Sequence, residues 1–248
     1  PNYFSLKVDE KKFRIGNLPI RDNINHYNTY TILYEFMRFD GTFQQDSNDF
    51  WKIEDRWFGN SIAYQDPYRR AVYAKSKDLM LETSKKINRE INRSIELSDT
   101  IIITLGLTEV WVKSNNNKIS CMNPGYAGGG GKDETIFYAS SYFDNLKNLR
   151  NIMSIINKKN NVANVIFTVS PVPLGATFRN IDVVIANEES KSILRVAAAE
   201  IEKEFKNAFY FPAYEFCKYS KHVFEEDGRH VTPAMVDKIV QLFLNTYF

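Results

Sequence analysis

The sequence predicts an α/β fold built on a mostly parallel sheet, and three observations support this. Short runs rich in β-branched residues alternate with longer segments whose apolar residues recur at helical spacing. This alternation is typical of βαβ units, in which right-handed crossovers connect parallel strands. Of the 248 residues, 44% are hydrophobic and 25% are charged, which is the balance of a globular protein with a full core.

The first half of the chain contains one clear helix followed by one clear strand. Residues 76–98 carry isoleucines and a leucine at helical spacing among lysines, glutamates and asparagines, which predicts an amphipathic helix. The β-branched run over residues 100–105 then predicts a strand that is buried on both faces of a parallel sheet. Residues 29–39 fit either a helix or a strand.

The second half repeats the same alternation. The predicted elements are a helix over 142–156, a strand over 165–169, a helix over 193–205, a strand over 208–211 and a helix over 236–243. Thr232 and Pro233 precede the last helix as an N-cap residue and a proline at the first helical position.

Charge and composition exclude several classes of partner. The net charge of +2 offers no electrostatic footprint for nucleic acid or for an anionic membrane. The longest apolar runs are far too short to span a bilayer. The two cysteines, Cys121 and Cys217, lie far apart without metal-binding spacing. We therefore expect reduced thiols, with a single disulfide as the alternative, and no metal site.

The start of the chain shows no targeting signal. Residue 1 is a proline, and no basic segment followed by an apolar stretch is present, as a secretory signal would require. We expect a cytoplasmic location from the reduced thiols alone, because the natural N-terminus and any address that it carries are not in view. The sequence also leaves the oligomeric state open.

The clearest chemical motif is Asp227-Gly228-Arg229-His230, which follows the last predicted strand. Ligands of parallel sheets bind beyond the carboxyl ends of the strands, so the residues after each strand are the first candidates for a site. An Asp three residues before a His can place its carboxylate on Nδ1 of the imidazole and leave Nε2 free as a general base. The alternative is a histidine that only caps or packs against the following helix.

Further candidates follow the other strands. Gly106 comes directly after a predicted strand, where its N–H can donate to an oxyanion, and the Thr108 hydroxyl can add a second donor. The competing interpretation is a tight turn whose threonine bonds to its own backbone. Ser170 follows the next predicted strand at the same edge. Asn28, near the start, forms either a structural turn or a loop that contacts substrate.

Three other features favour ordinary structural roles. The glycine-rich segment 125–131 lacks the Gly-Lys-Ser/Thr ending of a phosphate-binding loop and does not open a helix after a buried strand. We interpret it as a flexible surface loop that binds no phosphate. Glu109 is expected to be a solvated charge, and Arg229 either binds an anion or forms a surface ion pair.

Several of these segments together resemble one protein family. In chain order they are Asn25–Thr29 and Ile32–Tyr34, which match loosely, and then Thr104–Trp111, Thr168–Val172, Ser190–Arg195, Tyr210–Glu215 and Asp227–His230. Their order and joint pattern resemble the GSCFA-domain family, a branch of the SGNH (GDSL-like) hydrolase superfamily. The resemblance extends from Asn25 to the C-terminus.

The resemblance implies both a fold and a chemistry. It implies a single domain over residues 1–248 with a flavodoxin-like three-layer α/β/α sandwich. It also implies an acyl-ester hydrolase or acyltransferase, for example of acetyl groups, that acts on a carbohydrate. His230 would be the general base and Asp227 its orienting carboxylate, while Gly106 and Thr108 stand where the superfamily has Gly-x-Asn. No metal or organic cofactor is required.

The nucleophile is the point at which the sequence departs from the family pattern. The string Gly-Ser-Cys-Phe-Ala is absent, and the nearest match, Ser120-Cys121, continues differently and lies in another region. We therefore expect the nucleophilic serine and the first strand upstream of Pro1. The strand 100–105 would then lack one neighbour, and the chain alone would be inactive. The alternatives are a non-catalytic carbohydrate-binding protein of the same fold and a flavodoxin-like nucleotide binder.

Overall fold

The structure of the protein is a computed structural model. It describes residues 14–15, 18–19, 25–55, 61–70, 72–125, 130–131 and 134–248. The centre of the glycine-rich segment, residues 126–129, lies outside the described residues, so the flexibility expected of it stays a prediction.

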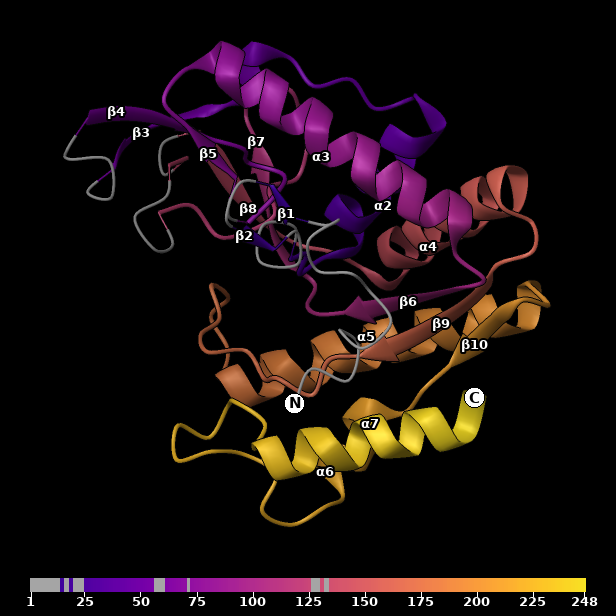
Figure 1. Ribbon diagram of the computed structural model, residues 1–248. Coiled ribbons are helices and arrows are strands. Elements are labelled where there is room, and N and C mark those ends of the chain that lie inside the picture. Colours follow the sequence, from indigo (N-terminus) through magenta and orange to yellow (C-terminus); the bar gives the residue numbers. More distant parts are fainter. Residues whose placement is uncertain are drawn as a thin grey trace.

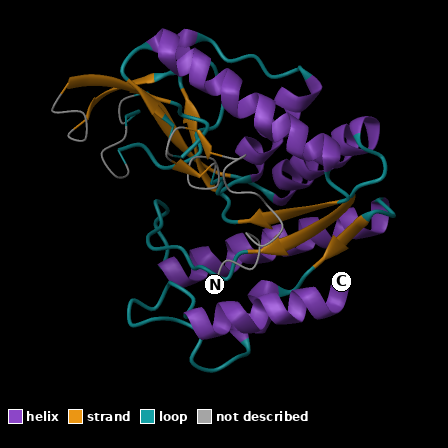
Figure 2. Cartoon of the chain, viewed as in Figure 1, coloured by secondary structure: helices purple, strands orange, loops and turns teal. Residues whose placement is uncertain are grey.

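Helices separate single strands or short groups of consecutive strands along the described chain (Figures 1 and 2). The helices are α2 (Thr29–Asp40), the 3₁₀-helix η3 (Ser47–Asp49), α3 (Lys77–Leu97), α4 (Tyr142–Lys159), α5 (Val183–Glu204), α6 (Ala213–Lys218) and α7 (Pro233–Tyr247). The strands are β1 (Arg14–Ile15), β2 (Leu18–Pro19), β3 (Trp51–Asp55), β4 (Ser61–Gln65), β5 (Tyr73–Ala74), β6 (Thr100–Leu105), β7 (Glu109–Lys113), β8 (Thr135–Ala139), β9 (Asn164–Val169) and β10 (Ala208–Tyr210).

The centre of the fold is a parallel sheet of three strands in the order β10-β9-β6. Strands β6 and β9 pair from Thr100 opposite Asn164 to Leu105 opposite Val169, and β10 pairs with the other side of β9. The chain passes from β6 to β9 through a hairpin and α4, and from β9 to β10 through α5. The predicted α/β fold with a parallel sheet is thereby confirmed. The carboxyl ends of the three strands point to the same side of the molecule (Figure 1).

Alternate residues of β9 explain how helices pack on both faces of this sheet. Val165, Phe167 and Val169 point into the main core, which they share with buried residues of α2, α4 and α5. Ile166 points the other way and packs in a cluster with Phe243 of α7. Successive side chains of a strand point to opposite faces, so a strand that is covered on both sides carries apolar residues on both faces.

Strand β6 departs from its prediction. Ile102 is 41% exposed, whereas the last five residues of β9 are all buried. Among the described strands β6 pairs only with β9, and α7 packs over Ile166 of β9. The expectation that β6 is buried on both faces is therefore wrong. A β-branched run identifies a strand but does not show which elements cover it.

The described residues contain three small antiparallel sheets besides the parallel sheet (Figure 2), and in the first of them β1 pairs with β2. The sequence did not reveal the other two. Strands β3, β4 and β5 form one, and β7 and β8 form a hairpin. Strand β7 begins soon after β6 ends, at Glu109. The hairpin therefore stands next to the carboxyl ends of the parallel strands.

Two helix starts were hard to predict. Residues 29–40 are a helix, so the choice left open for this segment is settled. Helix α5 begins at Val183, ten residues before the predicted start. The prediction missed its first turns because Val184 and Ile185 are exposed there, so these turns lack an apolar stripe that faces the core. Thr232 is the N-cap of α7 and proline follows it, as predicted. None of the helices in the described part of the chain is long and apolar enough to cross a membrane.

Candidate active site

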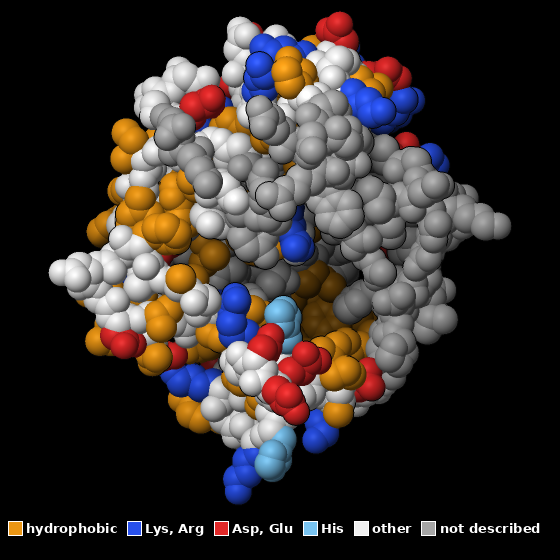
Figure 3. Space-filling view, turned by 90° about the vertical axis from the view of Figure 1, so that its left-hand side faces the viewer, with side chains coloured by type: hydrophobic (Ala, Val, Ile, Leu, Met, Phe, Trp, Pro, Cys, Tyr) orange, Lys and Arg blue, Asp and Glu red, His pale blue; other side chains and the backbone are white. Residues whose placement is uncertain are grey.

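A cavity of about 610 Å³ lies at the carboxyl ends of β6 and β9. The space-filling view shows this side of the molecule hollowed, with hydrophobic side chains inside the hollow (Figure 3). Four of the six site residues that the sequence predicted lie in its wall, namely Asn28, Gly106, Ser170 and His230. The fold therefore has a cavity at the carboxyl ends of its parallel strands, where ligands of such sheets bind.

His230 and Asp227 are in direct contact on the loop before α7. Nδ1 of the His230 ring contacts Oδ2 of Asp227. The other carboxylate oxygen accepts the backbone N–H groups of Arg229 and His230, both at 2.9 Å. Gly228 has a φ of +68°, which glycine adopts without strain. When the Nδ1–H of the imidazole donates to the carboxylate, Nε2 is left as the basic nitrogen.

This pair stands at the rim of the cavity. The side chains of His230 and Asp227 are 69% and 44% exposed. Hydrogen bonds from the backbone of His230 and Arg229, together with the contact to the imidazole, lower the pKa of Asp227 to about 2, so the carboxylate is ionised at neutral pH. Arg229 donates to the Pro173 carbonyl at 3.4 Å and forms no ion pair with a described carboxylate.

Gly106 turns the chain from β6 into the cavity wall. A β-carbon here would lie 2.5 Å from the carbonyl oxygen of Tyr27, so this close approach requires glycine. The N–H of Leu107 donates to the same Tyr27 oxygen at 2.9 Å. The Gly106 N–H itself has no acceptor among the described residues, which leaves it available to a ligand.

Thr108, the second predicted donor, is held away from the cavity. It is buried, and it is absent from the described wall. Its N–H donates to Ser190 Oγ at 3.0 Å, and its carbonyl accepts the N–H and the hydroxyl of Ser140, both at 2.8 Å. The chain turns into β7 at this point, and these bonds fix Thr108 in the interior. Its position therefore does not support a role as an oxyanion donor.

Asn28 and Ser170 differ in how much of their side chain is free. Asn28 is the N-cap of α2, where Oδ1 accepts the Thr31 N–H at 3.0 Å and Nδ2 donates to the Ser120 carbonyl at 3.0 Å. Its amide is thus committed to the fold. Ser170 Oγ accepts the Val172 N–H at 3.3 Å, and its own hydrogen has no acceptor among the described residues.

Sequence reasoning missed Lys191, which reaches the cavity from α5. Its side chain is 2% exposed, and Nζ donates to the Gly106 carbonyl at 2.7 Å. Burial lowers the pKa of Lys191 to about 8. No ion pair joins it to a carboxylate in the described part of the chain. Its helical spacing from Leu194 and Ala198, which are buried on the same helix, could have placed Lys191 on the buried face, although not at the Gly106 carbonyl.

Glu109 is buried rather than solvated. It is 3% exposed. Its Oε1 accepts from Thr177 Oγ1 at 2.5 Å and from Arg179 Nε at 3.2 Å, and its Oε2 accepts the Phe178 N–H at 3.1 Å. The expectation of a solvated charge is wrong, because the loop after β9 folds back over this carboxylate.

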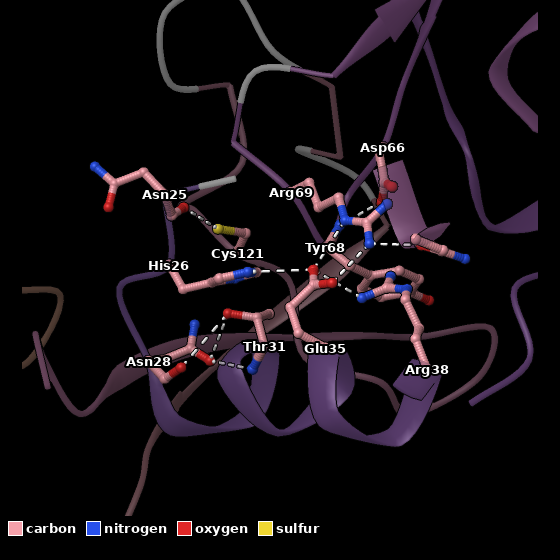
Figure 4. A network of polar contacts seen from close by, with 11 residues as sticks. Asn25, His26, Asn28, Thr31, Glu35, Arg38, Asp66, Tyr68, Arg69 and Cys121 are labelled. Carbon is pink, nitrogen blue, oxygen red and sulfur yellow. Dashed lines mark hydrogen bonds and ion pairs between the residues drawn. The ribbon is translucent and has the colours of Figure 1, made fainter. Parts of the chain in front are cut away.

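A buried ion network backs one wall of the cavity (Figure 4). His26 lines the cavity, and its Nε2 lies 3.2 Å from Glu35 Oε1. Glu35 also accepts from Arg69 at 2.8 and 2.6 Å and from Arg38 at 3.0 Å. Burial by itself would raise the pKa of Glu35, but the two guanidinium groups hold that pKa well below its usual range. The arginines lie behind the described wall, so we assign this network a structural role.

Cys121 shares this wall without being an activated nucleophile (Figure 4). Its thiol donates to the Asn25 carbonyl at 3.1 Å, and burial raises the pKa of the thiol to about 12. Cys217 is also buried, and neither cysteine is in a disulfide. In the described ranges, no group of three or more His, Cys, Asp or Glu side chains is placed to hold a metal ion.

Fold and site define a mixed α/β protein with a histidine–carboxylate pair beside a cavity at its strand ends. The chain matches the model of the GSCFA family over residues 4–243 and belongs to this family. No curated protein and no solved structure matches it. The family membership expected from separate short motifs is thereby confirmed over nearly the whole chain.

Proposed function

We propose that this protein is an acyl-ester hydrolase or acyltransferase of the SGNH type, with a carbohydrate as the alcohol part of the ester. The observation that carries the proposal is the His230–Asp227 pair at the rim of the cavity. The parallel sheet with helices packed on both faces is compatible with the three-layer arrangement of that superfamily. Membership of the GSCFA family supports the same proposal.

In the proposed reaction, Nε2 of His230 removes the proton of a serine hydroxyl while the oxygen attacks the ester carbonyl. Ionised Asp227 stabilises the imidazolium that forms. The free N–H of Gly106 is a donor available to the oxyanion. His230 then returns the proton to the leaving alcohol. Water or a sugar hydroxyl finally takes the acyl group from the serine.

The proposal takes the serine from outside the described residues. No described serine or cysteine forms a hydrogen bond with the His230 side chain. Ser170 shares the cavity, but its Oγ accepts a backbone N–H, and the Cys121 thiol is held in its protonated form.

The same observation favours a second candidate, a carbohydrate-binding protein without catalysis. An oriented imidazole beside a cavity can donate and accept hydrogen bonds with sugar hydroxyls even where no nucleophile is present. The two candidates differ in whether an acyl-enzyme forms, and turnover of an activated ester decides between them.

The test is hydrolysis of an aryl acetate by the full-length natural protein and by its His230→Ala variant. We expect the substitution to lower kcat by about 10³-fold or more, as removal of a general base does in serine hydrolases. His222→Asn is the matched control, because His222 lies outside the described cavity wall and has a φ of +54°, which asparagine tolerates.

Turnover that survives His230→Ala would contradict the proposal. Wild-type protein that binds sugars but releases no acetate would instead favour the non-catalytic candidate. Trapping of an acyl-enzyme, detected as added mass on the intact protein, would identify the nucleophile directly.

A further inference from the structure

Three aromatic rings meet at one side of the cavity. They are Trp111 of β7, Phe137 of β8 and Phe178 of the loop after β9. The ring centroids of Trp111 lie 5.0 Å from Phe178 and 5.7 Å from Phe137, in edge-to-face contacts that fix the orientations of the rings. Trp111 and Phe178 line the cavity, and Phe178 is 56% exposed. An exposed ring of fixed orientation is therefore part of the wall.

The loop that carries the exposed ring is firmly anchored. The Phe178 N–H and the side chains of Thr177 and Arg179 all donate to the carboxylate of Glu109. Arg179 also donates to Glu189 at 2.8 Å. Burying a carboxylate is costly unless such bonds compensate it, so these contacts define one loop conformation. That conformation keeps the ring at the cavity instead of in the core, which is typical of a ligand-binding surface.

The rest of the wall mixes apolar side chains with amides. Pro173 and Leu174 lie in it, together with Asn25 and Asn123. The Asn123 amide has no hydrogen-bond partner among the described residues. An acyl chain needs apolar surroundings throughout, whereas a sugar ring offers C–H groups on its faces and hydroxyls at its edge. The mixed wall therefore suits a sugar better than an acyl chain.

We propose that Trp111 and Phe178 form the subsite for the sugar ring of the substrate, a pyranose whose C–H face rests on the aromatic surface. The electron-rich faces of aromatic rings attract such polarised hydrogens, and nearby amides bind the hydroxyls. The assignment rests on the proposed function in taking the ligand to be the carbohydrate part of an ester. It locates sugar specificity in the β7–β8 hairpin and the loop after β9.

The experiment compares two esters on the full-length natural protein. Glucose pentaacetate contains the pyranose, whereas vinyl acetate has neither a sugar nor an aromatic ring. We expect Phe178→Ala and Phe178→Leu to raise KM for the sugar ester about tenfold and to leave kcat/KM for vinyl acetate within about twofold. Phe178→Tyr keeps the ring and should behave as wild type.

Phe143→Ala is the matched control, because Phe143 is a 77% exposed phenylalanine on α4 that is absent from the described wall. It should change neither reaction. Phe178→Leu distinguishes ring stacking from general apolar contact, since leucine keeps apolar area without a flat face. The proposal is wrong if Phe178→Leu keeps the wild-type KM for the sugar ester. It is also wrong if the Phe178 variants raise KM for vinyl hexanoate but not for the sugar ester, because the surface then binds acyl chains.

Binding measurements separate this inference from the proposed function. Saturation-transfer NMR with methyl glucoside, galactoside, mannoside and xyloside needs no turnover. Binding by wild type that weakens in Phe178→Leu supports the subsite even where no ester is hydrolysed. Failure of all four glycosides to bind wild type, or binding that Phe178→Leu leaves unchanged, would overturn it.

Discussion

Lys191 donates from Nζ to the carbonyl oxygen of Gly106 at 2.7 Å. This hydrogen bond ties α5, the helix between β9 and β10, to the turn after β6. The preceding residue, Ser190, accepts the N–H of Thr108 in the same turn. Two successive residues of one helix thus bind both ends of the turn. These two hydrogen bonds fix the position of the Gly106 N–H at the cavity.

Lys191→Met should change how stability depends on pH. Burial lowers the pKa of Lys191 to about 8, below the value of about 10.4 for an unfolded lysine. Between these values the unfolded chain binds more protons than the folded chain, so the wild type gains stability as the pH rises. From pH 7 to pH 9.5 its free energy of unfolding should rise relative to that of the variant by about 2 kcal/mol.

Urea unfolding of both proteins at the two pH values measures this difference. Lys203→Met, on the exposed end of the same helix, is the control and should show no such pH-dependent difference. If the free energy of unfolding of the wild type falls relative to that of Lys191→Met as the pH rises, the change has the wrong sign. That result would contradict a lowered pKa of Lys191 in the folded protein.

Gly106→Ala should destabilise the protein through the turn itself. Its β-carbon would lie 2.5 Å from the Tyr27 carbonyl oxygen, and backbone atoms cannot yield cheaply. We expect a loss of about 2 kcal/mol or more in the free energy of unfolding. Gly228→Ala provides the comparison, because no atom lies within 4 Å of its added carbon and only the positive φ opposes it, at about 1 kcal/mol. Equal losses in the two variants would argue against crowding at Gly106.

The sequence predicted the site contacts between residues that are close in the chain and missed those between residues that are far apart in it. Asp227 and His230 are three residues apart in one turn, so their spacing was enough to bring them together. The Lys191–Gly106 bond joins residues 85 positions apart, and no local pattern reports it. Thr108 was assigned from its place in a motif, but the turn into β7 decides where its side chain lies.

The same distinction holds for the fold. Strand β9 has four apolar residues among its last five and is buried as predicted, because both of its faces are covered by neighbouring helices. The antiparallel sheets β3-β4-β5 and β7-β8 escaped prediction, since none of their strands is longer than five residues. Strands this short give too few alternations for a period of two to stand out.

Glu109→Gln should loosen the loop that carries Phe178. The substitution keeps the shape but removes the charge that two side-chain donors and one N–H share. We expect a loss of about 2–3 kcal/mol in the free energy of unfolding, as for a buried charged hydrogen-bonding group. Glu189→Gln removes the exposed partner of the same arginine and should cost no more than about 0.5 kcal/mol. Comparable losses in the two variants, by urea unfolding, would deny Glu109 its anchoring role.

Glu35→Gln should destabilise the protein most strongly near neutral pH. The carboxylate accepts hydrogen bonds from both Arg38 and Arg69, so Glu35→Gln removes the charge that these two buried guanidinium groups contact directly. Breaking a buried ion pair from one side costs about 3–5 kcal/mol. Urea unfolding at pH 7 measures this loss, and Glu82→Gln, which removes an exposed helical pair with Lys86, should leave stability essentially unchanged.

The pH dependence of this loss separates charge from shape. The pKa of Glu35 is held below its usual range in the folded state, so the unfolded chain takes up this proton first as the pH falls. The stabilisation is complete above about pH 5 and declines as the pH falls through about 4, the ordinary value for glutamate. The difference between wild type and Glu35→Gln should therefore narrow between pH 7 and pH 3.5. Protonation of Glu35 removes the charge from the wild type as well, so an effect of charge makes the two free energies of unfolding converge in acid. A difference that stays constant from pH 7 to pH 3.5 would mean that glutamine destabilises the protein through packing alone.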